Sequence, residues 1–380
     1  MTTIDDLNPF SPTFGQSPAV VVGREQLLEL VSRAFVPGSD PARKTLLRAY
    51  RGSGKTVLLN EIQDLATAAG WLVIQEDAAP ASVGLIERLM DRIQAPLISD
   101  NAPKRRVTGI QGQIPILGGI GIDFEDKGTV EPRRTLRTAL EDRFTSSPTL
   151  NGILLSVDEI HEASRAEIQE IGNAVQQLDR DHKPIAVALA GLPLADEEQE
   201  PTFLSRCFTP SLSTVPDDEI ARGLQETAQL SGWAFTHNAL RLAVEVAAGY
   251  PYMMQLIGWE SFERARATNP GTIEARHVEA ATDPALRRLN RSVLFSLDKR
   301  VSTAELAFLF AMAQDSQESR MRDIAERMGQ SPQYANVYRQ RLLDAGLIVQ
   351  IDRGVVDFAI PGHRSKIRAD QAYGANRAGS

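Results

Sequence analysis

Four short apolar runs alternate with amphipathic segments in the first half of the chain, and this alternation restricts the fold most strongly. The intervening segments, such as KTVLLNEIQDLATAAG and SRAEIQEIGNAVQQLDRD, have apolar residues at helical spacing. Runs that alternate with helices predict an α/β core, in which a parallel sheet is flanked by helices. The predicted strands are residues 45–50 (TLLRAY), 71–77 (WLVIQED), 152–159 (GILLSVDE) and 184–191 (PIAVALAG), with a fifth at 207–212.

The segment AYRGSGKT, residues 49–56, follows the first run and opens a helical segment. It is similar to the phosphate-loop pattern G-x-x-x-x-G-K-[ST], in which glycine N–H groups and a helix N-terminus bind phosphate. Ala49 replaces the first glycine, which is tolerable at the end of a strand if φ stays negative. The lysine would reach the β and γ phosphates, and the threonine hydroxyl would bind Mg²⁺. The residues expected to contact nucleotide are Arg51, Gly52, Ser53, Gly54, Lys55, Thr56 and Val57.

An acidic pair, Asp158 and Glu159, ends the third run about a hundred residues later. At the carboxyl end of a strand beside the phosphate loop, Asp158 would complete the Mg²⁺ site and Glu159 would deprotonate the attacking water. The pair could instead cap the next helix. Because the sequence has no N-K-x-D motif for guanine, ATP is the expected nucleotide, with ATP hydrolysis as the reaction. His161, just after the pair, could sense nucleotide, but a solvated helix start is the favoured interpretation.

Composition excludes several classes of protein. A hydrophobic content of 42% and a charged content of 24% are ordinary for a globular protein, and the net charge of −8 excludes a wholly basic nucleic-acid coat. The single cysteine, Cys207, allows no internal disulfide and fits a reducing compartment. It is expected to be a small buried residue. With no leader-like start and no apolar run of roughly 18 residues, the chain is expected to be cytoplasmic, with no membrane partner.

The length of 380 residues predicts more than one domain. An extended arm, residues 1–20, is expected to lie on the first domain. The α/β core is predicted at 21–215, with a hairpin insertion at about 103–130, where glycines and β-type alternation interrupt the pattern. A helical lid is predicted at 216–284, a winged helix-turn-helix at 285–369 and a disordered tail at 370–380.

The carboxy-terminal unit shows three helical segments followed by a hairpin, which is the winged-helix order. Ser331 and Pro332 mark the start of the third helix, SPQYANVYRQRLLDAGL, whose buried face is expected to hold Ala335, Leu342 and Leu343. Outward groups of such a helix can read duplex DNA, but winged helices also bind proteins or serve as scaffolds. The residues expected to contact DNA are Gln333, Tyr334, Asn336, Arg339, Arg341 and Arg353, with Arg364, Lys366 and Arg368 touching its backbone.

Taken together, the two nucleotide motifs, the helical segment and the carboxy-terminal unit resemble the AAA+ and related STAND branch of P-loop ATPases. They look most like bacterial relatives of the origin-recognition-type ATPases, over roughly residues 8–365. The resemblance implies that Gly23 and Arg24 in VGRE lie near adenine and ribose, although these residues could simply start a helix. It implies that Arg206 in FLSRCF reaches a neighbour's γ-phosphate in a self-associated form, and that Pro251 in GYPYMMQL packs near the nucleotide.

Two polar residues typical of that family are missing. Ala190 and Gly191 stand where the fourth strand often ends in a polar residue, and Tyr252 stands where many relatives have an arginine. These departures favour slow turnover, with a switch between ATP-bound and ADP-bound forms. Two functions remain open: an ATPase that moves a DNA-binding winged helix, and a signalling ATPase whose winged helix binds a protein.

Overall fold

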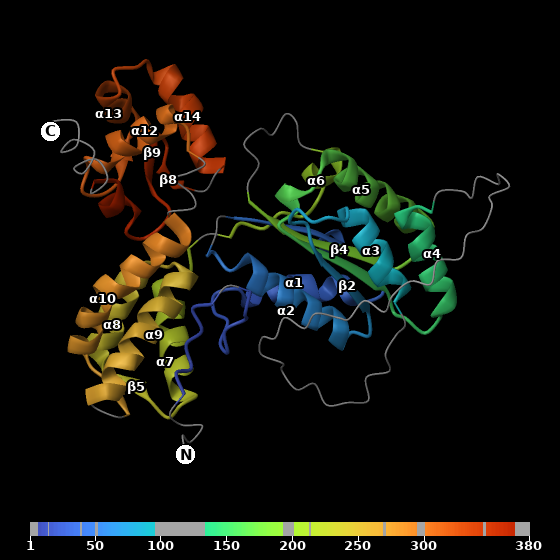
Figure 1. The fold of residues 1–380 in the computed structure, drawn as a ribbon, viewed down its shortest axis with the longest axis horizontal. Helices are drawn as coiled ribbons and strands as arrows, with labels where there is room; N and C mark the ends of the chain where they lie inside the picture. Colours follow the sequence, from blue (N-terminus) through green and yellow to red (C-terminus); the bar gives the residue numbers. More distant parts are fainter. Residues whose placement is uncertain are drawn as a thin grey trace.

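The protein consists of an α/β unit, a helical unit and a carboxy-terminal unit (Figure 1). The structure is a computed structural model. The predicted hairpin at 103–130, the tail at 370–380 and Arg51 lie outside the residues it describes. Those residues are 7–13, 15–38, 40–49, 52–95, 134–192, 201–212, 214–268, 271–294, 301–344 and 347–368.

The α/β unit is built on a four-stranded parallel sheet in the order β1-β4-β3-β2. The central strand β3 is buried on both faces from Ile153 to Val157, which explains its continuous apolar run. The predicted fifth strand is reduced to an isolated bridge between Phe208 and Thr45 beside β1. The strands are β1 (Lys44–Arg48), β2 (Leu72–Asp77), β3 (Ile153–Asp158) and β4 (Ile185–Gly191).

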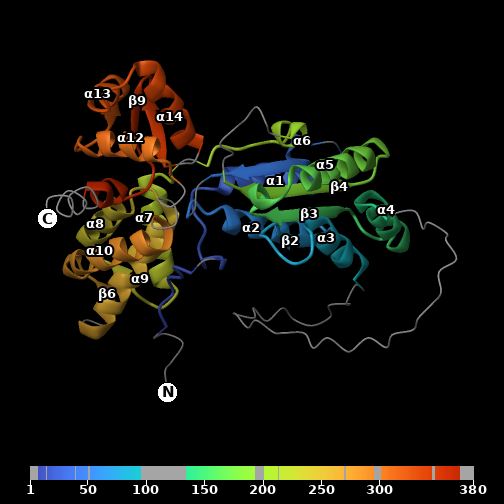
Figure 2. The same ribbon diagram turned by 45° about the horizontal axis from the view of Figure 1, so that its top comes forward.

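Helices cover both faces of this sheet, as Figure 2 shows. The helices α1 (Glu25–Ser32) and α2 (Lys55–Ala68) pack on one face. The other face is covered by α3 (Leu85–Gln94), α4 (Leu136–Ser146), α5 (Arg165–Arg180) and the short α6 (Thr202–Ser205). Single turns of 3₁₀ helix are η2 (Arg33–Phe35), η3 (Pro41–Arg43) and η4 (Ile160–Glu162).

The helical unit has four main helices and one short parallel strand pair. Helix α10 continues through Pro284, so the predicted boundary at 284 falls inside a helix, which then ends in a π-helical turn. No helix in the described parts of the chain is long and apolar enough to cross a membrane. The elements are α7 (Asp217–Gln229), β5 (Ala234–Phe235), α8 (His237–Ala247), α9 (Pro251–Thr268), β6 (Thr272–Ile273), α10 (Ala275–Leu289) and η6 (Asn290–Leu294).

The amino-terminal arm corrects one expectation, because it lies mainly on the helical unit and not on the first domain (Figures 1 and 2). Phe10 is buried in the helical core against Gly258, where a side chain would overlap its ring. Asn8 donates to the carbonyl of Trp259 over 3.1 Å. These partners lie about 250 residues along the chain, so no local pattern reveals them. The arm then reaches the α/β unit through Ser17, which accepts a hydrogen bond from Asn60.

The carboxy-terminal unit has three labelled helices, a further helical segment at 363–368 and a three-stranded antiparallel sheet in the order β7-β9-β8. This arrangement is compatible with a winged helix. The helix α14 begins as predicted, with the Ser331 hydroxyl accepting from the Tyr334 N–H over 3.2 Å. Ala335 and Leu342 are buried, and Leu343 packs beside them. The elements are α12 (Thr303–Ala313), β7 (Ser319–Arg320), α13 (Met321–Arg327), α14 (Pro332–Asp344), β8 (Ile348–Asp352) and β9 (Val355–Phe358).

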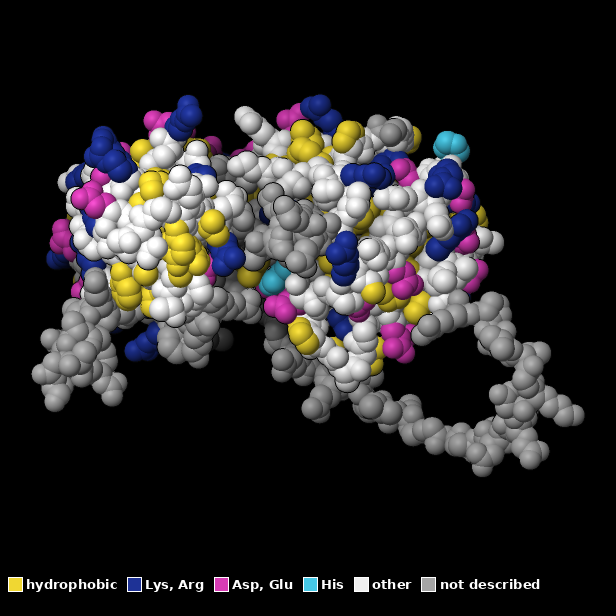
Figure 3. All heavy atoms as spheres, turned by 90° about the horizontal axis from the view of Figure 1, so that it is seen from above, with side chains coloured by type: hydrophobic (Ala, Val, Ile, Leu, Met, Phe, Trp, Pro, Cys, Tyr) yellow, Lys and Arg dark blue, Asp and Glu magenta, His cyan; other side chains and the backbone are white. Residues whose placement is uncertain are grey.

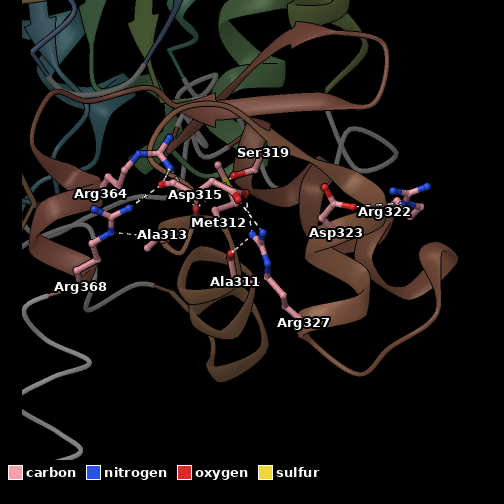
Figure 4. A network of polar contacts seen from close by, with 10 residues as sticks. All are labelled: Ala311, Met312, Ala313, Asp315, Ser319, Arg322, Asp323, Arg327, Arg364 and Arg368. Carbon is pink, nitrogen blue, oxygen red and sulfur yellow. Dashed lines mark hydrogen bonds and ion pairs between the residues drawn. The ribbon is translucent and has the colours of Figure 1, made fainter.

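Three arginines bind the last carbonyl groups of α12 (Figure 4). Arg327 donates to the Ala311 carbonyl and forms two further bonds to the Asp315 carboxylate, of 2.6 and 2.7 Å. Arg364 and Arg368 donate to other carbonyls of the same helix end, where the unpaired oxygens concentrate partial negative charge. Arg364 and Arg368 therefore make internal contacts, and their contact with a DNA backbone stays a prediction.

We expect Asp315→Asn to weaken the carboxy-terminal unit, because Arg327 loses its charged partner. Amide hydrogen exchange of the intact protein should show the opening free energy of α12 and α13 reduced by about 2 kcal/mol. The hydrogen bond from Arg327 lowers the pKa of Asp315. The carboxylate therefore stabilises the fold fully above the unfolded-chain pKa of about 4, and this contribution is lost as pH falls through the lowered folded-state value.

Asp323→Asn is the matched control, because Asp323 pairs with Arg322 at the surface, where the Arg322 side chain is 84% exposed. Its effect should stay below about 0.5 kcal/mol. Equal exchange protection in wild type and Asp315→Asn at neutral pH would contradict the stabilising role of this pair.

Candidate nucleotide site

The loop between β1 and α2 has the backbone that the phosphate-loop pattern requires. Gly52 and Gly54 have φ angles of 78° and 92°, and Gly54 is the N-cap of α2. Ser53 and Lys55 are buried within the loop. Ala49, in place of the first glycine, is buried at the strand end and is not among the non-glycine residues with positive φ. Alanine is therefore accommodated without the backbone strain that a left-handed conformation would cause.

The structure brings the two nucleotide motifs into direct contact. The Thr56 hydroxyl donates to one oxygen of Asp158 over 2.8 Å, and the N–H of Glu159 donates to the other oxygen over 2.8 Å. Strand β4 lies between β1 and β3, so the contact spans the carboxyl edge of the sheet, where α/β folds bind ligands.

A magnesium ion bound with nucleotide needs only one or two protein oxygens, because phosphates and water supply the rest. Thr56 and Asp158 present a hydroxyl and a carboxylate together, so this donor set fits such an ion. In the described residues, no group of three or more His, Cys, Asp or Glu side chains could hold a metal ion. A dedicated all-protein metal site is therefore not a feature of the described parts of the chain.

Glu159 is held in an unusual conformation beside the loop. It is one of the few non-glycine residues with positive φ, at 51°, a geometry that concentrates at functional sites. Its Oε2 atom is buried without a hydrogen bond and lies 3.3 Å from Nδ1 of His161. His161 is only 10% exposed, so the expected solvated position is wrong. His161 lies beside Gly191, and a side chain at position 191 would crowd the backbone of His161.

A cavity that is open to solvent joins the phosphate loop to the arm and to α9. Its walls include Val57, Glu159 and Pro251. Arg24 also lines the cavity at the start of α1, and burial lowers the pKa of its guanidinium. Gly23 is not in the lining and packs against Val215.

Helix α9 approaches the phosphate loop closely. The Tyr252 N–H donates to the Gly52 carbonyl over 3.3 Å. A Cβ atom at Gly52 would overlap the Tyr250 hydroxyl and lie 2.7 Å from its ring carbon Cζ. The Tyr252 hydroxyl donates to Ser292 over 3.2 Å, in the π-helical turn that precedes the carboxy-terminal unit. One residue therefore contacts the phosphate loop through its backbone and the end of the helical unit through its side chain.

Arg206 lies apart from the chain's own cavity. It is exposed at the end of α6 and is absent from the cavity lining. The neighbouring Cys207 is buried, and this burial raises the pKa of its thiol to about 11. A thiol with such a pKa stays protonated, which fits the expected packing role.

The expected DNA-contacting residues lie on α14 and on the β8–β9 turn. Arg339 is half-buried, donating to Asn336 over 2.9 Å and to Gln350 over 2.7 Å, so it ties the helix to the sheet. On the face of the molecule that is drawn in Figure 3, basic and acidic side chains are interspersed, and no continuous basic surface is seen. Gln333, Tyr334, Asn336, Arg341 and Arg353 are exposed.

Several cavity residues were not predicted from the sequence. Ser11, Thr13 and Gln16 of the arm line the cavity, and so does Gln255 of α9. The arm residues carry no motif, and their position depends on contacts with distant helices. Gln255 could have been found by helical spacing, because it lies one turn after Pro251 on the face that meets the loop.

Comparison with known proteins supports the fold. The Aeropyrum pernix ORC2 protein, solved as ADPNP–ADP complexes, aligns with a TM-score of 0.56 at 13% identity, covering 95% of this chain and 98% of that one. Pyrobaculum aerophilum Cdc6p aligns at 16% identity with a TM-score of 0.49, covering 95% and 97%. The Thermotoga maritima RuvB Holliday junction branch migration motor aligns at 15% identity with a TM-score of 0.47, covering 91% and 95%.

Two further comparisons concern the sequence. A family described as a domain of unknown function (DUF8462) matches residues 293–365, and none of the curated proteins matches the chain. The likeness to the ORC2 protein shows the fold: an α/β P-loop core followed by helical units. The chain therefore has the fold of an origin-recognition-type AAA+ P-loop ATPase, as its motifs led us to expect.

We expect Gly52→Ala to destabilise the protein more than Gly232→Ala. Both glycines have positive φ, at 78° and 72°, so each substitution costs about 1 kcal/mol of backbone strain. Only the Cβ at Gly52 would meet Tyr250, while the space around Gly232 is open. Overpacking should add about 1–3 kcal/mol, seen as a lower melting temperature in thermal unfolding.

The double variant Gly52→Ala/Tyr250→Ala tests the cause of this difference. Removing the tyrosine ring should recover part of the lost stability, giving a non-additive cycle. Equal melting temperatures for Gly52→Ala and Gly232→Ala would show that Tyr250 does not pack against the loop in solution.

Proposed function

We propose that the protein is a cytoplasmic, slow, Mg²⁺-dependent ATPase that acts as a nucleotide-driven switch on a DNA-binding winged helix. The observation that carries this proposal is the hydrogen bond between Thr56 and Asp158, 102 residues apart. It joins the phosphate loop to the acidic pair. A chance glycine-serine loop would not be expected to meet an acidic strand end in this way.

The proposed chemistry divides among a few groups of the loop and the strand ends. The backbone N–H groups from Gly52 to Gly54 and the N-terminus of α2 bind phosphate oxygens, and Lys55 neutralises their charge. Thr56 and Asp158 would hold Mg²⁺, which would supply positive charge against the charge that develops on the phosphates. Glu159 accepts the proton of the attacking water, for which its buried and unbonded Oε2 atom is suited.

Adenine nucleotides are the proposed ligands. The sequence lacks the guanine motif, and the similar ORC2 protein was solved with ADPNP and ADP. Slow turnover follows from the missing polar groups at Ala190 and Gly191 and from Tyr252 in place of an arginine. With fewer charges to stabilise the transition state, chemistry is slower and the ATP-bound state lasts longer.

A physical connection from the nucleotide to the carboxy-terminal unit supports the switch. Tyr252 binds the Gly52 carbonyl through its N–H and Ser292 through its hydroxyl. Ser292 in turn donates to the carbonyl of Arg288 in α10. A change in the loop on hydrolysis would move α9, and with it the turn that leads to the carboxy-terminal unit. Helix α9 would then have two positions, and the bound nucleotide would shift the equilibrium between them.

Duplex DNA is the proposed partner of the carboxy-terminal unit. Gln333, Asn336 and Arg341 are exposed along α14 and could reach base edges or phosphates, and Arg353 at the hairpin turn could reach the backbone. A protein partner is the second candidate. Val337, 50% exposed in the same outward face, favours it because an exposed apolar residue suits a protein interface better than DNA.

Self-association is part of the proposal. Arg206 is exposed and outside its own cavity, so it could serve the γ-phosphate of a neighbouring copy. Arg24, which lines the cavity, would hold the adenosine end of the nucleotide through its side chain, and the neighbouring Gly23 would position it.

The central experiment measures ATP binding and turnover with and without duplex DNA. We expect Lys55→Ala to lose ATP binding, and Glu159→Gln to keep binding but lose about 10²–10⁴-fold in turnover. Glu29→Gln, on the exposed face of α1, is the control and should match wild type. ATP binding without turnover in wild type would reduce the proposal to a nucleotide-gated switch, and absence of ATP binding would overturn it.

DNA binding should weaken steeply with salt and depend on Arg341 and Arg353. Each arginine-to-alanine change should lower affinity and reduce the salt slope by about one unit, if the side chain contacts phosphate. Arg322→Ala, which removes an exposed arginine of α13, is the matched control. A wild-type protein that fails to bind duplex DNA at low salt would favour the protein-binding alternative.

A further inference from the structure

Gln255 is a buried amide in the wall of the nucleotide cavity with half of its hydrogen-bonding capacity unused. It lies on α9, one turn after Pro251, and is 6% exposed. Its Nε2 atom is buried and has no hydrogen-bond partner. Buried amide nitrogens without a partner are rare, because they lose their water without a replacement. The group therefore points to a partner that is not part of the chain.

The orientation of this amide is determined by a contact with the arm. The Ser11 N–H donates to Gln255 Oε1 over 2.9 Å. A backbone N–H can only donate, so the oxygen of the amide must face Ser11 and the nitrogen must face away. The Nε2 donor is thereby held in place before any ligand binds, which lowers the entropy cost of using it.

The other polar side chains of the arm in this part of the cavity form hydrogen bonds with one another. Thr13 donates to Gln16 over 2.9 Å, and the Ser11 hydroxyl lies 3.1 Å from that of Thr13. These side chains are exposed and can also bind water. The wall also includes the apolar residues Pro18, Val20 and Met254, beside Arg24. Apolar walls with a few placed polar groups are usual for sites that bind small molecules.

The position of Gln255 relative to the phosphate loop suggests which part of a nucleotide it meets. Phosphates bound at the N-terminus of α2 leave the rest of the cavity, between the arm and α9, for the nucleoside. We propose that Gln255 Nε2 donates a hydrogen bond to a ring nitrogen of adenine and so helps to select the base. This inference rests on the proposed function, since it assumes that the cavity binds ATP.

The test compares ATP with inorganic tripolyphosphate, which has the phosphates but no base. Gln255→Glu keeps an oxygen for Ser11 and removes the donor, so ATP should bind about tenfold more weakly while tripolyphosphate binds as in wild type. Gln255→Met, which removes both groups, should also weaken ATP alone. In calorimetric titrations of wild type with 1-deaza-, 3-deaza- and 7-deaza-ATP, one analogue should show the same loss.

The possible outcomes separate this inference from the proposed function. If wild type binds neither ATP nor tripolyphosphate, the proposed function fails. If wild type binds ATP but both Gln255 variants bind it equally well, Nε2 makes no contact with the base and the inference is overturned. Equal losses of ATP and tripolyphosphate would assign Gln255 a structural role and overturn it as well.

Discussion

A glycine at position 52 allows the helical unit to approach the phosphate loop. Its φ of 78° curls the loop, and its missing side chain leaves room for Tyr250. The carbonyl of Gly52 accepts a hydrogen bond from the Tyr252 N–H, so this residue belongs to the phosphate loop and also contacts the helical unit. The cavity exists because these units meet here: the α/β unit supplies its phosphate end, and α9 with the arm supplies the rest.

The parallel sheet determines the chemistry that this junction can perform. With the order β1-β4-β3-β2, the carboxyl ends of β1 and β3 flank β4, and Thr56 reaches across to Asp158. The end of β4 supplies no polar side chain at Ala190 or Gly191, but Gly191 leaves space that His161 fills. The imidazole stands 3.3 Å from the Glu159 carboxylate. A side chain at Gly191 would therefore crowd Ile160 and His161, which follow β3.

Features set by local pattern could be predicted from the sequence. The four strands, the phosphate loop, the acidic pair and the start of α14 each depend on neighbours within a few residues, and their described parts are found where the patterns placed them. Features set by distant contacts could not. The arm lies on α9 through Phe10, and Arg364 and Arg368 turn inward to α12. Helix α10 passes through Pro284, because tertiary packing can override a local helix breaker.

The arm has a consequence for the lifetime of a bound ligand. At one end of the arm, Phe10 is buried in the helical core, and at the other, Ser17 accepts a hydrogen bond from Asn60 of α2. Residues that line the cavity lie between these two contacts. A ligand that leaves past the arm would have to displace it, and this would require Phe10 to leave the helical core. The residence time of such a ligand would then depend on how fast the arm detaches.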